Sequence, residues 1–235
     1  MGLTPRVAPL GGYAVYVELC REVSLECNRR VHALYYALSS RAGDLGVTEV
    51  VPAYSSLTIF YDPRRVRWRE IARAVEELVR DAEVFTPPPP RSFMIPVVYG
   101  GEYGPDLERA ASMRGLSVDE FVRIHTSRVY TCYMLGFTPG FLYLGDVDPR
   151  IAVPRLETPR ERVPRGSVGI AGRQTGLYGI ESPGGWRIIG RTPVVTFDPR
   201  RDPPIPIRPG DRVRFYEIGE DEYRELEGVW IEEVQ

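Results

Sequence analysis

The first part of the chain changes between two hydrophobic periods. Residues 13–19 (YAVYVEL) alternate apolar and polar side chains and contain Val and Tyr, which is typical of a half-buried strand. After Ser24, apolar residues return at helical spacing as far as Leu38, and the pattern stops before Gly43. This pattern predicts a helix with Ser24 as its N-cap.

The same two periods then repeat. Two runs rich in Val, Ile and aromatic residues predict strands, and a run with Ile71, Val75 and Leu78 on one face predicts a helix. The resulting order, β-α-β-β-α, is most of a ferredoxin-like unit. The predicted elements are strands at 47–54 and 56–61 and a helix at 68–82.

A run of four prolines at 87–90 separates this part from the rest. Because consecutive prolines cannot continue a helix and favour an extended spacer, we place a domain boundary here, with domains at 1–88 and 89–235. The second part begins with a strand at 93–99 and two short helices, and then consists of short strands and turns, which favours a β-barrel. We expect helices at 107–113 and 118–125, the second with a Ser117/Glu120 capping box, and strands near 129–135, 167–171, 186–190, 193–197 and 212–218.

Glycine is concentrated in the second part, with eleven glycines between Gly136 and Gly190. They alternate with short apolar and aromatic runs, so the segment is not a flexible linker. Glycine at this density indicates tight turns or backbone that approaches another group closely. Polar side chains that lie among these turns are candidates for a small-molecule site, and they are Arg173, Gln174, Thr175 and Arg191.

Composition narrows the class of protein. The chain has 235 residues, 43% of them hydrophobic and 26% charged, which is ordinary for a soluble protein with a buried core. The net charge of −2 gives no general attraction to nucleic acid, and no apolar run reaches the roughly 18 residues that span a bilayer. The N-terminus lacks a secretory pattern, so we expect a cytoplasmic protein without nucleic-acid or membrane partners.

Two residue types limit the chemistry. All 30 basic residues are arginine, so a P-loop lysine and a Schiff-base lysine are both excluded. Phosphate or carboxylate recognition would therefore use Arg or backbone N–H groups. The three cysteines, Cys20, Cys27 and Cys132, are odd in number and have no CxxC spacing, from which we expect reduced thiols and no metal site.

Arginine is also unevenly distributed. Thirteen arginines lie between Arg150 and Arg214 against six carboxylates, whereas the last 19 residues contain eight acids and only Arg224. This pattern indicates either solvated faces that offset each other or an Arg-lined groove for an anionic ligand.

Several residues are candidates for chemistry. His125, at the end of a predicted helix, fits a proton-transfer group or a helix-terminal histidine that is satisfied by the backbone. The turns from Gly166 to Gly176, which include Gly172, could cradle an anion with successive N–H groups. Gln174 offers both a donor and an acceptor to an amide or lactam. Arg155 could clamp a carboxylate or phosphate, or simply lie on a surface loop.

Three segments together resemble one family. They are GFTPGFLYLG (136–145), the 154–178 segment that ends in VPRGSVGIAGRQTGLY, and SPGGWRIIGRTP (182–193). They are similar to the KipI, or allophanate hydrolase subunit 1-like, family, which includes the B-type subunit of the prokaryotic 5-oxoprolinase. One departure is Gly179, where relatives often have proline.

The resemblance implies a fold and a reaction. The fold is an α+β chain, with an N-terminal ferredoxin-like domain and a C-terminal cyclophilin-like β-barrel. The reaction is ATP-dependent opening of 5-oxo-L-proline to L-glutamate, with ATP as co-substrate, Mg²⁺ beside it, and the C-type and A-type subunits of 5-oxoprolinase as partners. By position, the implied site contains His125 and Gln174 as catalytic groups, with substrate or nucleotide bound by Arg155, Gly172, Arg173, Thr175 and Arg191.

Two other functions stay open at this stage. Some relatives inhibit a sensor histidine kinase, and others belong to enzymes that process amides or urea. The sequence also leaves open whether the isolated chain forms a homo-oligomer, although an obligate partner would require an exposed apolar patch.

Overall fold

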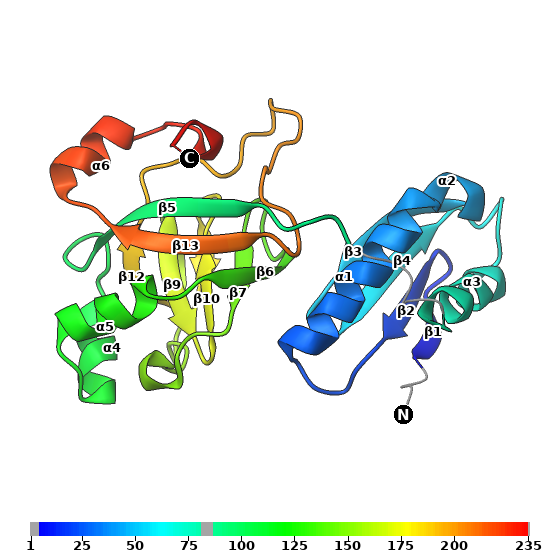
Figure 1. The fold of residues 1–235 in the computed structure, drawn as a ribbon, viewed down its shortest axis with the longest axis horizontal. Coiled ribbons are helices and arrows are strands. Elements are labelled where there is room, and N and C mark those ends of the chain that lie inside the picture. Colours follow the sequence, from blue (N-terminus) through cyan, green and yellow to red (C-terminus); the bar gives the residue numbers. More distant parts are fainter. Residues whose placement is uncertain (1–4, 81–86, 235) are drawn as a thin grey trace. The chain divides into compact units, whose positions relative to one another are not determined.

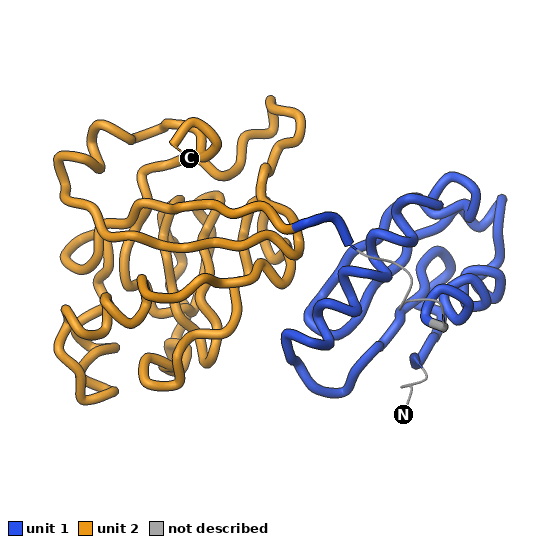
Figure 2. Tube along the Cα trace, viewed as in Figure 1, with its two compact units in different colours: residues 1–89 blue, residues 90–235 orange. Residues whose placement is uncertain are grey.

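The computed structural model describes residues 5–80 and 87–234, which form two compact units, residues 1–89 and residues 90–235 (Figure 1 and Figure 2). Each unit has its own hydrophobic core. Among the described residues, no helix has the length and apolar character that crossing a membrane requires.

The first unit is a four-stranded antiparallel sheet with two helices packed on it. The strand order is β1-β2-β4-β3, and α1 and α3 contact both the sheet and each other (Figure 1). Buried Val, Leu and Ile side chains from the strands and both helices form the core between these layers. The elements are β1 (Arg6–Leu10), β2 (Ala14–Glu18), α1 (Leu25–Ser40), α2 (Ala42–Leu45), β3 (Val47–Pro52), β4 (Ser56–Tyr61) and α3 (Trp68–Arg80).

The predicted order β-α-β-β-α is confirmed by β2, α1, β3, β4 and α3. Ser24 caps α1 as expected, because its hydroxyl oxygen accepts a hydrogen bond from the Cys27 N–H at 3.1 Å. β1 was not predicted from the sequence; it contains Pro9 and lies at the sheet edge. Proline weakens the sequence pattern of a strand because it has no N–H to donate, but it is tolerated in an edge strand. β1 occupies the outer position beside β2, where a ferredoxin-like unit has its last strand.

The expectation of three reduced cysteines is wrong. Cys20 follows β2 and Cys27 lies in the first turn of α1, and the two form a disulfide with their Cα atoms 6.2 Å apart. The two cysteines are seven residues apart, a spacing that does not by itself predict a disulfide. The pairing arises because the chain turns directly from the strand into the helix. Only Cys132 is a free thiol, and it is buried.

The second unit is built on a closed barrel of seven strands, in the order β10-β7-β6-β13-β5-β12-β9. β5 and β13 run parallel, and every other neighbouring pair is antiparallel. The barrel strands are β5 (Ser92–Tyr99), β6 (Tyr130–Leu135), β7 (Leu142–Gly145), β9 (Ser167–Ala171), β10 (Gln174–Leu177), β12 (Arg187–Arg191) and β13 (Arg212–Glu217).

Short elements surround the barrel. α5 packs against β13 and contributes Phe121 and Ile124 to the barrel core, and α4 packs against β12 and α5. The remaining elements are α4 (Leu107–Arg114), α5 (Val118–Thr126), α6 (Glu220–Leu226), the 3-10 turns η1 (Pro149–Ile151) and η2 (Ile231–Val234), and a small sheet of β8 (Arg160–Val163) and β11 (Ser182–Gly184).

The predicted barrel is therefore confirmed, but its strands were only partly located. The expected strand at 193–197 is wrong, because Pro193 has no N–H to donate and only Val195 forms an isolated bridge, with Trp230. Further elements that the sequence pattern did not predict are β7, β8, β10, β11 and α6. Each of these strands has only three or four residues, too few for an alternating pattern to be recognised.

Candidate active site

The turn between β9 and β10 presents three of the predicted site residues. Ala171 pairs with Gln174, so Gly172 and Arg173 form a two-residue loop, and Gly172 has a φ of 60° that favours glycine. The Gly172 N–H donates to the Val153 carbonyl at 2.7 Å. The tip of this hairpin is thus fixed from outside, which gives Gln174 a defined position.

Side chains of β10 alternate between the barrel core and its outer surface. Thr175 is fully buried in the interior, so Gln174 and Gly176 face outward. A Cβ on Gly176 would lie 2.9 Å from a ring carbon of Trp186 and 2.8 Å from the Leu142 carbonyl oxygen. Glycine is therefore required here, because Trp186 packs directly against the strand.

Four aromatic residues pack on this outer side of the strand: Phe141, Tyr178 and Trp186 are buried in a small hydrophobic cluster, and Tyr143 is partly buried at its edge. The ring centre of Phe141 lies 4.6 Å from Tyr143, 4.8 Å from Tyr178 and 5.4 Å from Trp186. Ala171, the cross-strand partner of Gln174, packs against the same cluster. We call the side of β10 that carries this largely buried aromatic cluster and the half-buried Gln174 the Trp186 face.

Arg155 is exposed beside the Trp186 face. Its guanidinium lies near Gly185, where a Cβ would be 3.7 Å from Nε. Burial raises the pKa of Tyr143, and the positive charge of Arg155 offsets part of that rise. Burial likewise raises the pKa of Tyr178 to about 12, again opposed by Arg155. Arg155 and Gln174 therefore both lie beside the buried aromatic cluster, where they offer a positive charge, a donor and an acceptor.

His125 lies inside the barrel rather than on this surface. It is fully buried, its ring stacks on Phe215 at 4.9 Å, and it contacts two residues through its nitrogens. Nδ1 lies 2.8 Å from the Tyr99 hydroxyl and Nε2 lies 2.9 Å from the Thr175 hydroxyl. His125 therefore touches β10 from beneath, on the opposite side of the strand from Gln174.

The hydrogen bonds around His125 define its protonation. The Thr175 hydroxyl donates to the Gly169 carbonyl at 3.0 Å, so it accepts from Nε2–H, and Nδ1 accepts from the Tyr99 hydroxyl. Burial lowers the pKa of His125 to about 3. This geometry does not support the predicted role as a proton-transfer group near neutral pH. It favours a neutral histidine that positions Thr175 and, through it, the hairpin.

The other two arginines lie near opposite ends of β9: Arg173 is in the hairpin loop beside Gln174, and Arg191 is at the far end. Arg173 is exposed and pairs with Asp146 at 3.3 Å. Arg191 pairs in register with Ser167, at the opposite end of β9 from the hairpin, and its guanidinium lies over Tyr103 at 5.6 Å. The prediction of one shared site is therefore corrected for Arg191, because a strand of five residues separates it from Gln174.

The loop between β6 and β7 contains residues that were not among the predicted site residues. It contains the motif GFTPG, and it lines a cavity of about 370 Å³. Phe137 has a φ of 65°, is 62% exposed, and lies 5.7 Å from Phe141 in an edge-to-face arrangement. The Thr138 hydroxyl is buried with no hydrogen-bond partner among the described residues. The Phe137–Phe141 contact thus links the buried aromatic cluster to this cavity.

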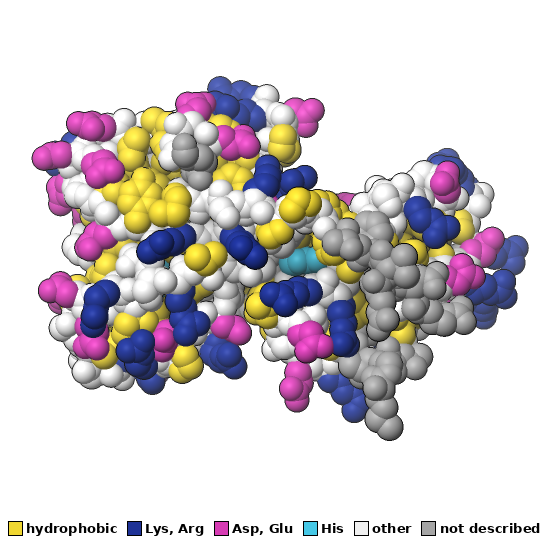
Figure 3. Space-filling view, viewed as in Figure 1, with side chains coloured by type: hydrophobic (Ala, Val, Ile, Leu, Met, Phe, Trp, Pro, Cys, Tyr) yellow, Lys and Arg dark blue, Asp and Glu magenta, His cyan; other side chains and the backbone are white. Residues whose placement is uncertain are grey.

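Most other arginines of the barrel unit are paired with nearby carboxylates. Figure 3 shows dark blue side chains on this unit, all of them arginine, interspersed with acidic and apolar ones. Arg160 binds Asp106 through two hydrogen bonds of 2.8 Å, and Arg162 binds Glu181. These pairs agree with the interpretation of offsetting solvated faces more than with one continuous basic groove.

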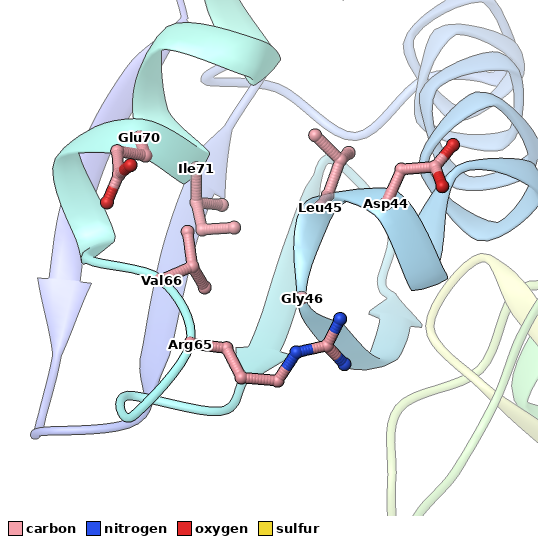
Figure 4. A pocket seen from close by; sticks show the side chains of 7 residues that line it. All are labelled: Asp44, Leu45, Gly46, Arg65, Val66, Glu70 and Ile71. Atoms are coloured by element: carbon pink, nitrogen blue, oxygen red, sulfur yellow. The ribbon is translucent and has the colours of Figure 1, made fainter.

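A smaller cavity of about 250 Å³ lies within the first unit (Figure 4). Leu45, Val66 and Ile71 point into its middle, while the Asp44 and Glu70 carboxylates lie on opposite sides. Arg65 donates to the Gly43 carbonyl at 3.1 Å. Because the charged groups do not converge, this cavity is a weaker candidate than the Trp186 face.

Metal binding by this chain alone is not favoured. Within residues 5–80 and 87–234, no group of three or more His, Cys, Asp or Glu side chains is arranged to hold a metal ion. The described residues therefore do not fit a resident Mg²⁺ site.

A closed barrel preceded by a small α+β unit defines a two-unit α+β protein. Residues 5–207 match the family model of the carboxyltransferase domain, subdomain C and D. The chain belongs to this family.

Several relatives match nearly the whole chain. It is 41% identical to the B-type subunit of 5-oxoprolinase from Bacillus subtilis (strain 168), over 93% of this chain and 95% of that protein. The identity with the B-type 5-oxoprolinase subunit of Escherichia coli O157:H7 is also 41%, over 88% of this chain and 93% of that protein.

Solved structures agree with the fold. The chain of TTHA0988 matches with a TM-score of 0.77 and 41% identity over 88% of this chain, which spans only 40% of that longer chain. The conserved uncharacterized protein of Pyrococcus horikoshii matches with a TM-score of 0.56 and 46% identity, over 93% of this chain and 100% of its own.

Proposed function

We propose that this chain is the B-type subunit of an ATP-dependent 5-oxoprolinase, which opens 5-oxo-L-proline to L-glutamate. The observation that carries the proposal is the 41% identity to the B-type subunit of a 5-oxoprolinase over 93% of this chain and 95% of that protein. A match across nearly the whole of both chains supports the same role in the complex, and Gln174 and Arg155 are suited to a small lactam with a carboxylate.

The proposed chemistry activates a stable amide. The lactam oxygen attacks the γ-phosphorus of ATP and ADP leaves; water then attacks the activated carbon, the ring C–N bond breaks, and phosphate is released. The ring nitrogen gains the proton that makes it an amine. Stabilising the charge that develops on oxygen is the main task of such a site.

This chain's own residues have separate tasks in the proposal. Gln174 hydrogen-bonds the lactam amide edge, because its side chain both donates and accepts. Arg155 holds the substrate carboxylate, for which its planar guanidinium is suited. Neutral His125 keeps Thr175 and the hairpin in place. Mg²⁺ comes with the phosphates of ATP, since the described residues offer no cluster for it.

We further propose that the chain alone is inactive and works in the cytoplasm with C-type and A-type partner subunits. Among the described residues, the Trp186 face shows one histidine beneath it, and that histidine is buried and neutral. A group that transfers the proton would then come from a partner.

The test is reconstitution. This chain is co-expressed with the C-type and A-type 5-oxoprolinase proteins of its source, and ADP and glutamate release from 5-oxoproline are measured together. Coupled release that disappears when this chain is omitted would support the proposal. An assembled complex that releases neither product would contradict it, and failure to assemble would favour the kinase-inhibitor alternative.

A second candidate is a component of an enzyme that acts on another amide or on urea. The chain is 24% identical to a putative urea carboxylase of Emericella nidulans over 83% of this chain, which is only 19% of that longer protein. Urea and allophanate should therefore be offered to the same assembled complex. ATP turnover with either of these and none with 5-oxoproline would favour this candidate.

A further inference from the structure

A second cavity of the barrel unit is lined by the long connection from β12 to β13 and by residues just before the C-terminal turn η2. Its volume is about 410 Å³, within the usual range for small-ligand sites. The backbone of Val195 holds the connection against this turn, because it accepts from the Ile231 N–H at 3.0 Å and donates to the Val229 carbonyl at 2.8 Å. The lining residues are Arg165, Val195, Phe197, Asp198, Pro199, Arg200, Arg201, Gly228 and Trp230.

The lining is positively charged. It contains three arginines against a single carboxylate, Asp198, which binds Arg200 through two hydrogen bonds of 2.9 Å. Arg201 is offset by Glu233 at 3.1 Å, outside the lining. Arg165 has no carboxylate partner among the described residues, and it is exposed. One uncompensated guanidinium therefore remains at the cavity wall.

Aromatic side chains complete the wall. Arg201 lies over the Trp230 ring at 4.5 Å, which holds its guanidinium at the cavity, and the Trp230 Nε1–H donates to Glu232 at 3.0 Å. Phe197 packs against Gly140 so closely that a Cβ on Gly140 would be 2.5 Å from the Phe197 Cβ. Gly140 lines the cavity of the β6–β7 loop, so the two cavities share this contact as a wall.

We propose that this second cavity is a binding site for a phosphate group, with Arg165 as the main charged contact and Arg201 as the second. Guanidinium groups bind phosphate oxygens through paired hydrogen bonds, and a chain without lysine must use them for this purpose. The phosphate could be inorganic phosphate or the phosphate chain of a nucleotide. Only its assignment to ATP rests on the proposed function; phosphate binding itself does not.

The test measures binding, without turnover, by calorimetry on the full chain. The probes are inorganic phosphate, tripolyphosphate, ATP and adenosine, each at two salt concentrations. Arg165→Ala should weaken phosphate and ATP binding by about tenfold, because one charge-assisted contact is lost. Arg165→Lys should recover part of the affinity. Arg109→Ala is the matched control, since Arg109 is an exposed arginine on α4 that is absent from this lining.

The outcomes separate the proposals. Saturable binding that weakens with salt and with Arg165→Ala, but not with Arg109→Ala, supports the site. ATP binding tighter than tripolyphosphate identifies a nucleotide, and equal binding identifies the phosphate chain alone. Absence of saturable phosphate binding, or an affinity that Arg165→Ala leaves unchanged, would contradict the proposed site. Because none of these measurements uses 5-oxoproline, the proposed reaction can fail while this site stands, and the reverse.

Discussion

At the scale of single residues, His125 connects three parts of the barrel. Its ring joins Tyr99 of β5 to Thr175 of β10, and the Tyr130 hydroxyl donates to its backbone carbonyl at 2.8 Å. Each ring nitrogen has one partner of the correct type. This set of hydrogen-bonded polar side chains in an apolar core holds β5, α5 and β10 in one arrangement, because every alternative arrangement leaves a buried polar group unpaired.

His125 also makes the stability of the barrel unit depend on pH. Its pKa is about 3 when folded against 6.5 in the reference state, so the unfolded chain binds the proton more readily. The contribution of His125 to the unfolding free energy is therefore fully present above about pH 6.5. It is lost as the pH falls toward 3, by up to about 1.4 kcal/mol per pH unit. Denaturant unfolding between pH 4.5 and pH 7 measures this slope.

His125→Gln is the comparison for that slope. The variant should be less stable at pH 7 and should lose most of the slope, since glutamine does not titrate. In the natural chain, nitrogen NMR should show His125 as the single neutral Nε2–H tautomer at pH 5. A histidine that protonates near pH 6 in the folded chain would contradict the assigned hydrogen bonds.

Gln174 is the residue on which the proposed lactam contact depends. Gln174→Ala should lower turnover of the reconstituted complex by about tenfold or more, because the amide edge of the bound lactam loses its hydrogen bonds to the Gln174 side chain. The thermal unfolding of the variant should be unchanged, as Gln174 is only half-buried at a hairpin end. Glu108→Ala, an exposed change on α4, is the matched control. Turnover that is equal in both variants would remove Gln174 from the site.

At the scale of elements, the β9–β10 hairpin depends on glycine where Trp186 crosses it. Gly176→Ala would place a methyl group 2.8 Å from the Leu142 carbonyl oxygen, which belongs to the neighbouring strand and cannot rotate away. We expect a loss of about 2–4 kcal/mol in unfolding free energy from this overpacking. Gly219→Ser is the control, because nothing lies within 4 Å of its Cβ position. Equal stability of the two variants would show that the strands can separate locally.

The disulfide makes a second prediction at this scale. It closes the short connection between β2 and α1, and constraining such a loop contributes about 2–3 kcal/mol to stability in the chain-entropy description. Cys20→Ser with Cys27→Ser should therefore lower the unfolding temperature of the first unit, and a reductant should do the same to the natural chain. Labelling of unfolded protein should detect one thiol without reductant and three with it. Three thiols in both conditions would contradict the pairing.

How well each element could be predicted follows from its length and its pattern. α1 and α3 are long, periodic helices, and the alternation in β2 extends over its full length, so the sequence located all three. β7 and β10 have four residues each, and glycine lies in both. Their pairing is decided by neighbouring strands in the closed barrel, which no local pattern reports.

At the scale of the whole molecule, the same distinction applies to the candidate site. Gln174 and Arg155 were chosen for the chemistry of their side chains, and both lie beside the buried aromatic cluster of the barrel unit. The burial of His125 and the distance of Arg191 from the hairpin depend on how strands close into a barrel. Phe137 was overlooked because its strained backbone and its exposure exist only in the folded loop.

The two units should behave as separate folding units. Each has its own hydrophobic core, and the second core consists only of residues from Phe93 onward. Arg91, just before β5, also belongs to the second unit, because its guanidinium pairs with the Asp211 carboxylate at 2.7 Å. A fragment of residues 90–235 therefore contains every strand of the barrel and should fold alone.

The measurement is a comparison of amide NMR spectra between this fragment and the whole chain, together with their unfolding curves. The resonances of the barrel strands should coincide, and the unfolding transition of the fragment should respond to acid but not to reductant. In the whole chain, acid and reductant should move different transitions, because His125 and the disulfide lie in different cores. A fragment that stays unfolded, or a single transition that moves with both treatments, would mean that the two cores stabilise each other and unfold as one.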